Sequence, residues 1–433
     1  MNDQSELERP VRADSSGRLQ LAPVVTLLLL TLAGTCSMMD RAIVNVALEP
    51  IRRDFGLSDA ELGLIAGLAA SACYGLASIP FGMLADYVNR RNLIALSLAI
   101  WSVMTGLCSF ANGFGPLVLA RMGVGLGEAG SGPATMSVIS ALFPPKSRAS
   151  AVSVFYLCNP LGALLALAVG GFLIQSIGWR PTFLIAAVPG LAVSVTLMLV
   201  VREPARLEHP LASQRQLLKS AVAFLVTHRA LPHLLIAITL VTFASMAISA
   251  WAPSFFIRYH GMTIGSVGRV LGLSNGILGF AGVLVSGPAA DFLGRRDPRL
   301  RLWGLATASL LLTPIVIVAL LIEPGAGAMT LYIVHVFFVF LFTAPSTAIT
   351  LSLAPAHLRG TVASIQFVGT FVLGMGLGPS LAGLLSTVLG GAFGSASLRW
   401  ALVFDALVFS WAGLHYWLSA RNLGPSSGSQ EGM

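Results

Sequence analysis

Charged residues are scarce in this 433-residue chain: Asp, Glu, Lys and Arg together make up 10% of it, whereas hydrophobic residues make up 55%. Ordinary soluble domains contain about 25% charged residues, so this composition is too apolar for a surface that faces water. The mean hydropathy of +0.83 leads to the same conclusion. Apolar stretches as long as a membrane-spanning helix, about 20 residues, recur along nearly the whole chain. The sequence therefore predicts a multi-pass membrane protein.

Cysteines and catalytic motifs are also scarce. The four cysteines, Cys36, Cys73, Cys108 and Cys158, lie in apolar runs without CxxC or metal-ligand spacing, which predicts small buried residues rather than a metal site. A Walker motif is missing, which argues against transport driven by ATP. The chain also lacks a nucleophile paired with a base, so a membrane-embedded lipid enzyme is a weak alternative. We expect no enzymatic activity, no cofactor and no metal ion.

Apolar residues run continuously instead of at every second position, which favours helices over membrane strands. Twelve windows reach spanning length, and a polar stretch at residues 202–230 divides them six and six. The predicted spans are 23–47, 60–85, 92–111, 116–141, 149–175, 181–201, 231–257, 264–290, 300–322, 329–353, 360–389 and 399–419. We expect an all-α membrane protein with a tail at 1–22, a six-helix bundle at 23–201, a linker at 202–230, a second six-helix bundle at 231–420 and a tail at 421–433.

Basic residues gather on one side of these spans. If both termini share a side with the loops that follow even-numbered spans, that side holds 18 of the 26 basic residues, the opposite side holds 6, and 2 lie within spans. Cytoplasmic loops are enriched in Lys and Arg, so both termini and the linker are predicted to be cytoplasmic. The basic residues are dispersed over short loops, which argues against a nucleic-acid partner. We expect a monomer in a bacterial inner membrane.

The two halves repeat a loop motif. GMLADYVNRR begins at Gly82 and GPAADFLGRR begins at Gly287, so a glycine, an aspartate and an arginine pair recur at a constant offset of 205 residues. The loops after spans four and ten also agree, with SRASAVS from Ser147 and LRGTVAS from Leu358. Such a repeat indicates two related units. Two six-helix halves in the same orientation are the plan of a transporter whose halves rock about a central site.

The repeated loop resembles the signature of the major facilitator superfamily, G-x-L-x-D-x-x-x-R-R, and RMGVGLGEA from Arg121 is similar to that superfamily's fourth-helix motif. Within the superfamily, MDR at Met39, GVGLGEAG at Gly123, SVFY at Ser153 and VVREPAR at Val200 resemble the Spinster family. The resemblance implies two pseudo-symmetric six-helix bundles, alternating access and coupling to protons.

The resemblance also implies a gate on the cytoplasmic side. The aspartate that ends span two would face the N-terminus of span eleven, which carries roughly half a positive charge. Its copy after span eight would lie near the start of span five. The predicted gating residues are Gly82, Asp86, Arg90, Arg91, Gly287, Asp291, Arg295 and Arg296.

Four charged residues lie well away from the ends of the first-half spans, namely Asp40 and Arg41 in span one and Arg121 and Glu128 in span four. An ionised side chain near the bilayer centre costs about 2.5 to 3.5 kcal/mol, so packing of the two spans would let acids and bases neutralise each other. A purely structural ionic network is one interpretation. We favour another, in which Arg41 and Arg121 attract an anionic substrate and Asp40 or Glu128 carries a proton. Which carboxyl titrates stays open.

Further polar and aromatic residues are predicted to line the cavity. They are Tyr74, Phe155, Tyr156, Asn159, Trp251, His335, Ser346 and Gln366. His335 could instead be a hydrogen-bonded packing residue. Aromatic walls with few polar groups suit an amphipathic ligand. We therefore expect a proton-coupled secondary transporter of a small amphipathic, anionic molecule, such as a lysolipid or a sphingolipid-like compound, with membrane lipids as its surroundings. A multidrug efflux antiporter or an organic-anion symporter is the alternative.

Overall fold

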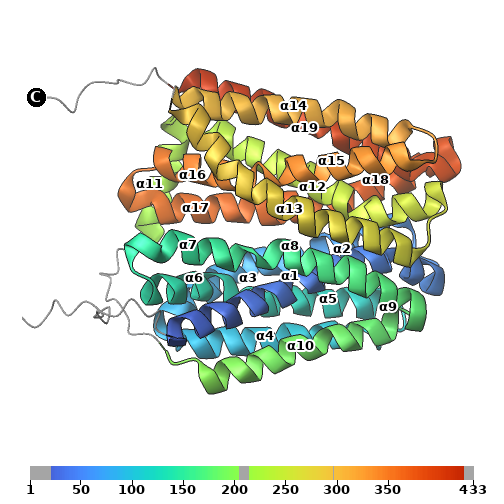
Figure 1. The fold of residues 1–433 in the computed structure, drawn as a ribbon, viewed down its shortest axis with the longest axis horizontal. Helices are drawn as coiled ribbons and strands as arrows, with labels where there is room; N and C mark the ends of the chain where they lie inside the picture. The colour runs from blue at the N-terminus through green and yellow to red at the C-terminus, as the bar shows by residue number, and fades with distance from the viewer. Residues whose placement is uncertain (1–20, 204–213, 296, 424–433) are drawn as a thin grey trace, which may run out of the picture.

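The computed structural model describes residues 21–203, 214–295 and 297–423, except for a few side chains within these ranges. Every regular element of this part of the chain is a helix, and it contains no strand. Most helices run side by side along the long axis of the molecule (Figure 1). The predicted all-α fold is confirmed.

The first half of the chain forms six crossings, three of which are divided by short breaks at Gly67, at Ala129 and Gly130, and at Leu157. Its elements are α1 (Leu21–Phe55), α2 (Asp59–Ala66), α3 (Leu68–Tyr87), α4 (Arg90–Cys108), α5 (Phe114–Glu128), α6 (Ser131–Leu142), α7 (Pro145–Tyr156), α8 (Cys158–Leu164), η1 (Leu165–Val169), α9 (Gly170–Ile177) and α10 (Trp179–Val200).

The second half forms six more crossings, and the helix α11 (Gln214–Thr227) precedes them. Its elements are α12 (Leu231–His260), α13 (Ile264–Gly294), α14 (Pro298–Leu321), α15 (Ala326–Phe340), α16 (Thr343–Leu353), η2 (Ala356–Leu358), α17 (Arg359–Val368), η3 (Gly369–Gly376), α18 (Leu377–Phe393), η4 (Gly394–Ala396) and α19 (Ser397–Asn422). The segments η1 and η3 are π-helical turns inside otherwise α-helical crossings, a distortion that is frequent at functional sites.

The number of crossings follows from where these helices break. Ten helical stretches of the described chain are long and apolar enough to span a membrane, and one of them, residues 359–422, holds two crossings. This stretch turns back at Gly394, whose φ of 54° favours glycine. The crossing made by α5 and α6 is not among the ten, because its many glycines and the charges of Arg121 and Glu128 make it less apolar than the other crossings. The twelve predicted spans are therefore all present as helices.

Helix α1 is longer than the first predicted span, which ends at residue 47, because it continues to Phe55. The added turns contain Glu49, Arg52 and Arg53, charges that mark the end of an apolar window in the sequence. The added turns are helical, and Glu49 there pairs with the guanidinium of Arg258.

The two halves of the chain occupy separate regions in Figure 1, with α1 to α10 below and α12 to α19 above. Helix α1 begins and α19 ends at the same end of the molecule, which we name the terminal side; the opposite end is the distal side. The exact bounds of the two bundles and of the linker stay predictions, and linker residues 204–213 lie outside the described ranges.

Small residues bring the two halves together toward the distal side. Helix α2 packs against α18, and α13 packs against η1 and α9. At the first contact, a Cβ on Gly63 would lie 2.7 Å from the carbonyl oxygen of Pro379. At the second, a Cβ on Gly171 would lie 3.0 Å from the Cα of Gly268. These distances leave no room for larger side chains, so the glycines allow the two backbones to approach closely.

Candidate functional site

Arg41 and Glu128 form an ion pair between α1 and the end of α5. The guanidinium Nε and Nη2 donate to Glu128 Oε2 over 2.8 and 2.5 Å. Ser37, one turn before Arg41 on the same face of α1, donates its hydroxyl to Glu128 Oε1 over 2.8 Å. The Glu128 side chain is only 3% exposed, whereas that of Arg41 is 17% exposed. The charge of the buried Glu128 carboxylate is therefore balanced by the Arg41 guanidinium.

Aromatic rings from both halves cover the Arg41 guanidinium. Its central carbon lies 5.0 Å from the ring centre of Tyr74 on α3 and 4.8 Å from that of Phe371 on η3. These two rings stack on each other with centroids 4.4 Å apart and planes inclined by 17°. Arg41 Nη1 also lies 3.4 Å from Met375 Sδ. Arg41 therefore sits where the first half meets η3 of the second half.

Asp40 and Arg121 lie apart from this group, inside the first bundle. Both are almost fully buried, and the contact between them runs from Arg121 Nη1 to the backbone oxygen of Asp40 over 3.3 Å. Among the described residues, Asp40 Oδ1 and Arg121 Nε have no hydrogen-bond partner. The four charges therefore fall into two groups. Arg41 and Glu128 form an ion pair that faces the second half. Asp40 and Arg121 are enclosed in the first bundle, and the hydrogen bond between them goes to the backbone of Asp40 and not to its carboxylate.

Three more predicted lining residues belong to the crossing made by α7 and α8. The rings of Phe155 and Tyr156 meet edge to face with centroids 5.6 Å apart. Tyr156 is 47% exposed, and Asn159 is half-buried beside Cys158. Phe155 and Tyr156 lie on α7 and Asn159 lies on α8, and both helices pack against α1, which carries Arg41.

The predicted lining residues of the second half do not converge on Arg41. Trp251 is fully buried and donates its Nε1 to the backbone oxygen of Pro379 over 3.0 Å. Ser346 bonds to the hydroxyl of Tyr416 over 2.9 Å, within the second half. Gln366 Nε2 lies 3.4 Å from Thr347 Oγ1.

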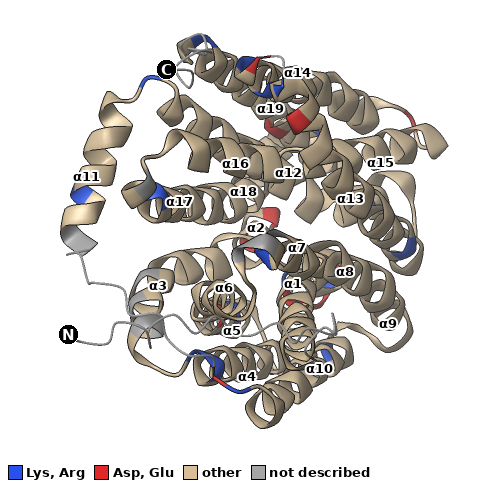
Figure 2. Cartoon of the chain, turned by 60° about the vertical axis from the view of Figure 1, so that its left-hand side comes forward, with Lys and Arg blue, Asp and Glu red and all other residues tan. Residues whose placement is uncertain are grey.

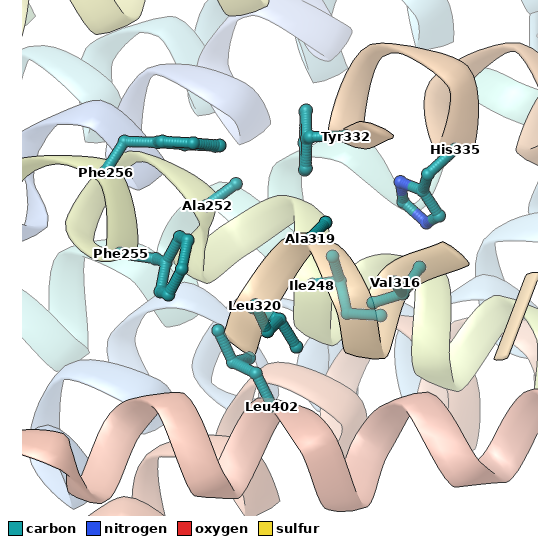
Figure 3. A pocket seen from close by; sticks show the side chains of 10 residues that line it. All are labelled: Ile248, Ala252, Phe255, Phe256, Val316, Ala319, Leu320, Tyr332, His335 and Leu402. Carbon is teal, nitrogen blue, oxygen red and sulfur yellow. The ribbon is translucent and has the colours of Figure 1, made fainter. Parts of the chain in front are cut away.

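His335 points into a small apolar pocket between α12, α14, α15 and α19 (Figure 3). Its neighbours there include Tyr332 and Phe256. Among the described residues neither ring nitrogen of His335 has a hydrogen-bond partner. The pocket is lined by helices of the second half alone, so His335 lies away from the Arg41–Glu128 pair.

An ion network that the sequence analysis did not predict joins the halves at the distal side. Arg258, near the end of α12, donates Nε to Glu49 Oε1 over 2.6 Å and both terminal nitrogens to the Asp59 carboxylate over 2.8 Å each. Ser386 on α18 donates to Asp59 Oδ2 over 2.6 Å. We name Glu49, Asp59, Arg258 and Ser386 the distal network. The sequence signal was an acid near the end of span one, another at the start of span two and an arginine ending span seven.

Predicted gating residues on the terminal side hold the start of the linker. Arg90 donates Nε to Glu203 Oε1 over 2.8 Å, and the backbone N–H of Arg91 donates to Glu203 Oε2 over 3.0 Å. Partial burial raises the pKa of Glu203, but the hydrogen bonds from Arg91 and Arg90 outweigh it, so this pKa lies below the ordinary carboxyl value. The VVREPAR motif is thus tied to the start of α4.

The other gating residues have fewer neighbours. A Cβ on Gly82 or Gly287 would meet nothing within 4 Å, so the chain is open around both. Asp291 is 74% exposed and lies 3.6 Å from Arg301 of its own half. Arg295 is exposed at the end of α13. The side chain of Asp86 and all of Arg296 lie outside the described part of the chain.

Comparison with known proteins identifies the fold. The Major Facilitator Superfamily matches residues 30–379. An MFS-type efflux pump of Mycolicibacterium smegmatis is 30% identical over 402 residues, which cover 90% of this chain and 91% of the pump. This chain belongs to the major facilitator superfamily. It is a multi-pass membrane transporter and not an enzyme, as the sequence predicted.

Two further comparisons concern the predicted resemblance to Spinster proteins within the superfamily. Protein spinster of Drosophila melanogaster is 28% identical over 319 residues, 70% of this chain and 52% of that protein. The solved structure of a bacterial homologue of the human lysosomal transporter Spinster, inward-facing and unoccupied, superposes with a TM-score of 0.84. It is 24% identical and covers 94% of this chain and 98% of its own. The predicted resemblance is confirmed.

In this major facilitator protein the described contacts therefore fall into three levels. The distal network and the glycine contacts hold the halves together at one end. The Arg41–Glu128 pair and its aromatic cover lie between α1, α3, α5 and η3. At the terminal end, the space beside Gly82 and Gly287 is open, because a Cβ at either glycine would meet no atom within 4 Å.

Proposed function

We propose that this transporter is proton-coupled and moves a small amphipathic anion by alternating access. The observation that carries the proposal is the Arg41–Glu128 pair beneath the stacked rings of Tyr74 and Phe371. It combines a guanidinium, a carboxylate and apolar surface contributed by both halves. A substrate bound there would contact both halves, and a transported molecule must do so to affect their relative position.

Competition for Arg41 supplies the coupling. A carboxylate or phosphate of the substrate and the carboxylate of Glu128 are alternative partners for the same guanidinium, which favours planar, paired oxygens. When the substrate takes Arg41, Glu128 keeps only the Ser37 hydroxyl, and a buried carboxylate without a cation is costly. Glu128 then takes up a proton. Release of the substrate restores the ion pair and releases the proton. Asp40, which does not touch Arg41 through its side chain, is the second candidate carrier.

The aromatic cover sets the class of substrate. Tyr74, Phe371 and Met375 offer apolar contact immediately beside the cation. A molecule with an acidic group and an apolar body can satisfy both, because the acid pairs with Arg41 and the chain displaces water from the rings. Lysolipids and sphingoid phosphates have this chemistry.

The arrangement of the two ends supports an inward-open state. The charge asymmetry of the loops predicts that the terminal side is cytoplasmic, and the distal network lies on the opposite side. A protein closed distally and open around Gly82 and Gly287 would receive substrate from the cytoplasm. We propose a bacterial inner membrane as its location.

Efflux is the second candidate function, and the similarity to an efflux pump over 90% of the chain favours it. In that case the same pair would exchange a proton from outside for a cationic or neutral drug. The two candidates differ in the sign of the preferred charge, because an antiporter of cations would need Glu128, and not Arg41, as the contact with its substrate.

Transport in proteoliposomes distinguishes these functions. Oleoyl lysophosphatidic acid and its neutral analogue monooleoylglycerol are offered under an imposed pH gradient. We expect accumulation of the anion driven by the gradient, loss of that coupling in Glu128→Gln, and no change in Glu323→Gln, an exposed acid outside the site. Full coupling in Glu128→Gln would exclude its role. Arg41→Ala should weaken transport of the anion far more than that of the neutral analogue, and equal losses would contradict recognition of the anion.

A further inference from the structure

One histidine side chain caps the start of the second bundle. His228 follows the end of α11, and its Nδ1 accepts hydrogen bonds from the backbone N–H groups of Ala230 and Leu231 over 3.2 and 3.0 Å. These N–H groups stand at the start of α12, where a helix offers them no partner of its own. Ala230 and Leu231 are fully buried, so solvent does not supply another acceptor. The His228 ring also packs on Phe224 of α11, with centroids 5.2 Å apart.

Helix α19 holds the same junction from the other side. Ser419 donates its hydroxyl to the backbone oxygen of Ala230 over 3.0 Å. One turn earlier on the same face of α19, His415 meets His233 of α12, with their Nδ1 atoms 3.0 Å apart and their ring centroids 5.1 Å apart. Both rings are half-buried. We name His228, His233 and His415 the terminal clasp.

Each hydrogen bond of the terminal clasp needs an unprotonated ring nitrogen. A neutral imidazole has one acceptor nitrogen, whereas an imidazolium has none. A proton on His228 Nδ1 would therefore face two backbone N–H donors, and both capping bonds would be lost. The His233–His415 pair keeps its bond when it gains one proton, because one ring still donates and the other accepts. It loses the bond when both rings are charged, since both nitrogens then donate and the charges repel.

The ionisable groups on the elements that adjoin the terminal clasp are mostly basic. They are Lys219 on α11, Arg229 beside His228, His357 on η2, Arg359 on α17 and Arg421 on α19. Helices α13 and α14, which pack against α12 and α19, add Arg295, Arg299 and the Asp291–Arg301 pair at 3.6 Å. The acid on α19 is Asp405, ten residues before His415, and α11, α12 and α17 carry none. Neighbouring cations disfavour a charged imidazole, so this setting keeps the rings neutral until acid is added.

We propose that the terminal clasp is a pH-sensitive switch, which ties the end of the linker to the second bundle when its rings are neutral and releases residues 228–231 when they are protonated. Burial lowers the pKa of His228 below the ordinary histidine value of 6.5. The folded clasp thus favours the neutral ring. Its contribution to stability is complete above about pH 6.5 and is lost as the pH falls through the lowered pKa.

Opening of the clasp changes how α11 is held. The helix lies at the terminal end of the molecule and stands at the periphery when that end is turned forward (Figure 2). Its contacts are with α12, η2 and α17, all of the second half. With the clasp closed, the end of α11 is fixed to α12 and α19 and moves with them. With the clasp open, the first turn of α12 loses its cap, and the connection between the two halves gains free length. This switch does not depend on Arg41 or on a substrate.

Distances between two spin labels test the switch. Cysteines replace Thr227 at the end of α11 and Asn422 at the end of α19, both exposed, in full-length protein whose four native cysteines are replaced by alanine. EDTA is present, so that no metal ion bridges the two rings. We expect one narrow distance at pH 8 and an additional broad component at pH 5.5, which disappears on return to pH 8. A distribution that does not change with pH, or a loss of helical circular dichroism at pH 5.5, would overturn the proposal.

Variants of the histidines assign the response. His228→Asn should keep the narrow distance at both pH values, because an amide oxygen caps a helix start and takes up no proton. His228→Ala should show the broad component already at pH 8. The matched control is His357→Asn, which replaces an exposed histidine on η2 and should respond to pH like the unmodified protein. A broad component in His228→Asn at pH 5.5 would refute the switch.

The histidine pair is tested in the same labelled protein. In His415→Asn the amide oxygen accepts a hydrogen bond from His233 in either protonation state, so the doubly charged pair cannot form. This variant should shift the midpoint of opening to lower pH. An unchanged midpoint would exclude the pair from the switch.

Discussion

Replacement of Arg258 by glutamine should open the distal side. Arg258 belongs to the second half and makes three hydrogen bonds to two carboxylates of the first half, those of Glu49 and Asp59. The side chains are 17%, 4% and 10% exposed. In the closed state Arg258→Gln leaves the buried Glu49 carboxylate without a cation and leaves Asp59 only the more distant Arg52, at 3.8 Å, whereas in an open state water would solvate both carboxylates. The variant therefore destabilises the closed state selectively.

The size of the effect follows from the burial. Removing one partner of a fully buried ion pair costs about 3 to 5 kcal/mol, and partial exposure together with the remaining amide donor reduces this to about 2 kcal/mol. A bias of about 2 kcal/mol changes the ratio of closed to open molecules about 30-fold. A protein that is almost entirely closed distally would then populate both states measurably.

Distances between spin labels at the distal side measure this shift. Labels at Arg53→Cys on α1 and Arg269→Cys on α13 are exposed and belong to different halves. Arg258→Gln should add a longer distance between them. The matched control is Arg180→Gln, because Arg180 pairs with Asp54 at 2.5 Å within the first half. If Arg258→Gln and Arg180→Gln give the same distance distribution, the distal network does not hold the halves together and the reasoning fails.

Three further predictions follow from the packing, the site and the linker. Gly268→Ala should lower the free energy of unfolding by about 1 to 3 kcal/mol, and with it the melting temperature in detergent, because the added Cβ would collide with α9 and η1. Gly390→Ala, whose Cβ would meet nothing within 4 Å, should leave the melting temperature unchanged. Equal melting temperatures of the two variants would contradict the close approach of the helices at Gly268. Arg41→Lys should raise the KM for an anionic substrate about fivefold, since loss of the planar contact with Tyr74 and Phe371 removes about 1 kcal/mol; an unchanged KM would show that charge alone is recognised. Glu203→Gln should destabilise the protein by about 1 kcal/mol or less at neutral pH. Because the pKa of Glu203 is lowered in the folded protein, Glu203 stabilises the fold only when it is ionised. The difference in stability between Glu203→Gln and the unmodified protein, measured in parallel thermal scans, should therefore shrink as the pH falls below about 4.3. A difference that does not depend on pH would exclude the charge as its cause.

Much of the fold could be predicted because the bilayer imposes a simple rule on sequence. Each crossing needs an apolar window of fixed length. The loop motif that begins at Gly82 and is repeated from Gly287 indicated that the two halves are related six-helix units. The breaks at Gly67 and within η1 and η3 could not be predicted, since they depend on which neighbour a helix meets. The end of α1 was missed for the same reason, because Glu49 stays in a helix when Arg258 lies opposite.

The sequence alone determined which residue types occupy the candidate site. Charges inside apolar windows are expensive, so Asp40, Arg41, Arg121 and Glu128 stood out without coordinates. Only the tertiary structure decided how they pair: Arg41 with Glu128 through side chains, and Arg121 with the backbone of Asp40. Helical spacing gives the direction of each side chain around its own axis but not the rotation of one helix against the next.

Contacts between residues of different halves could likewise not be predicted from the sequence. Phe371 and Met375 on η3 are 330 and 334 residues from Arg41 in the chain, and no local pattern connects them. The same holds for Arg258 and the acids of α1 and α2. Apolar length, charge asymmetry and repetition are local or periodic properties, so the sequence determined the class, the crossings and the charged candidates. Contacts between the halves depend on how the two bundles pack against each other. The spans of each bundle can be predicted from its own sequence, but this packing is defined only in the folded molecule.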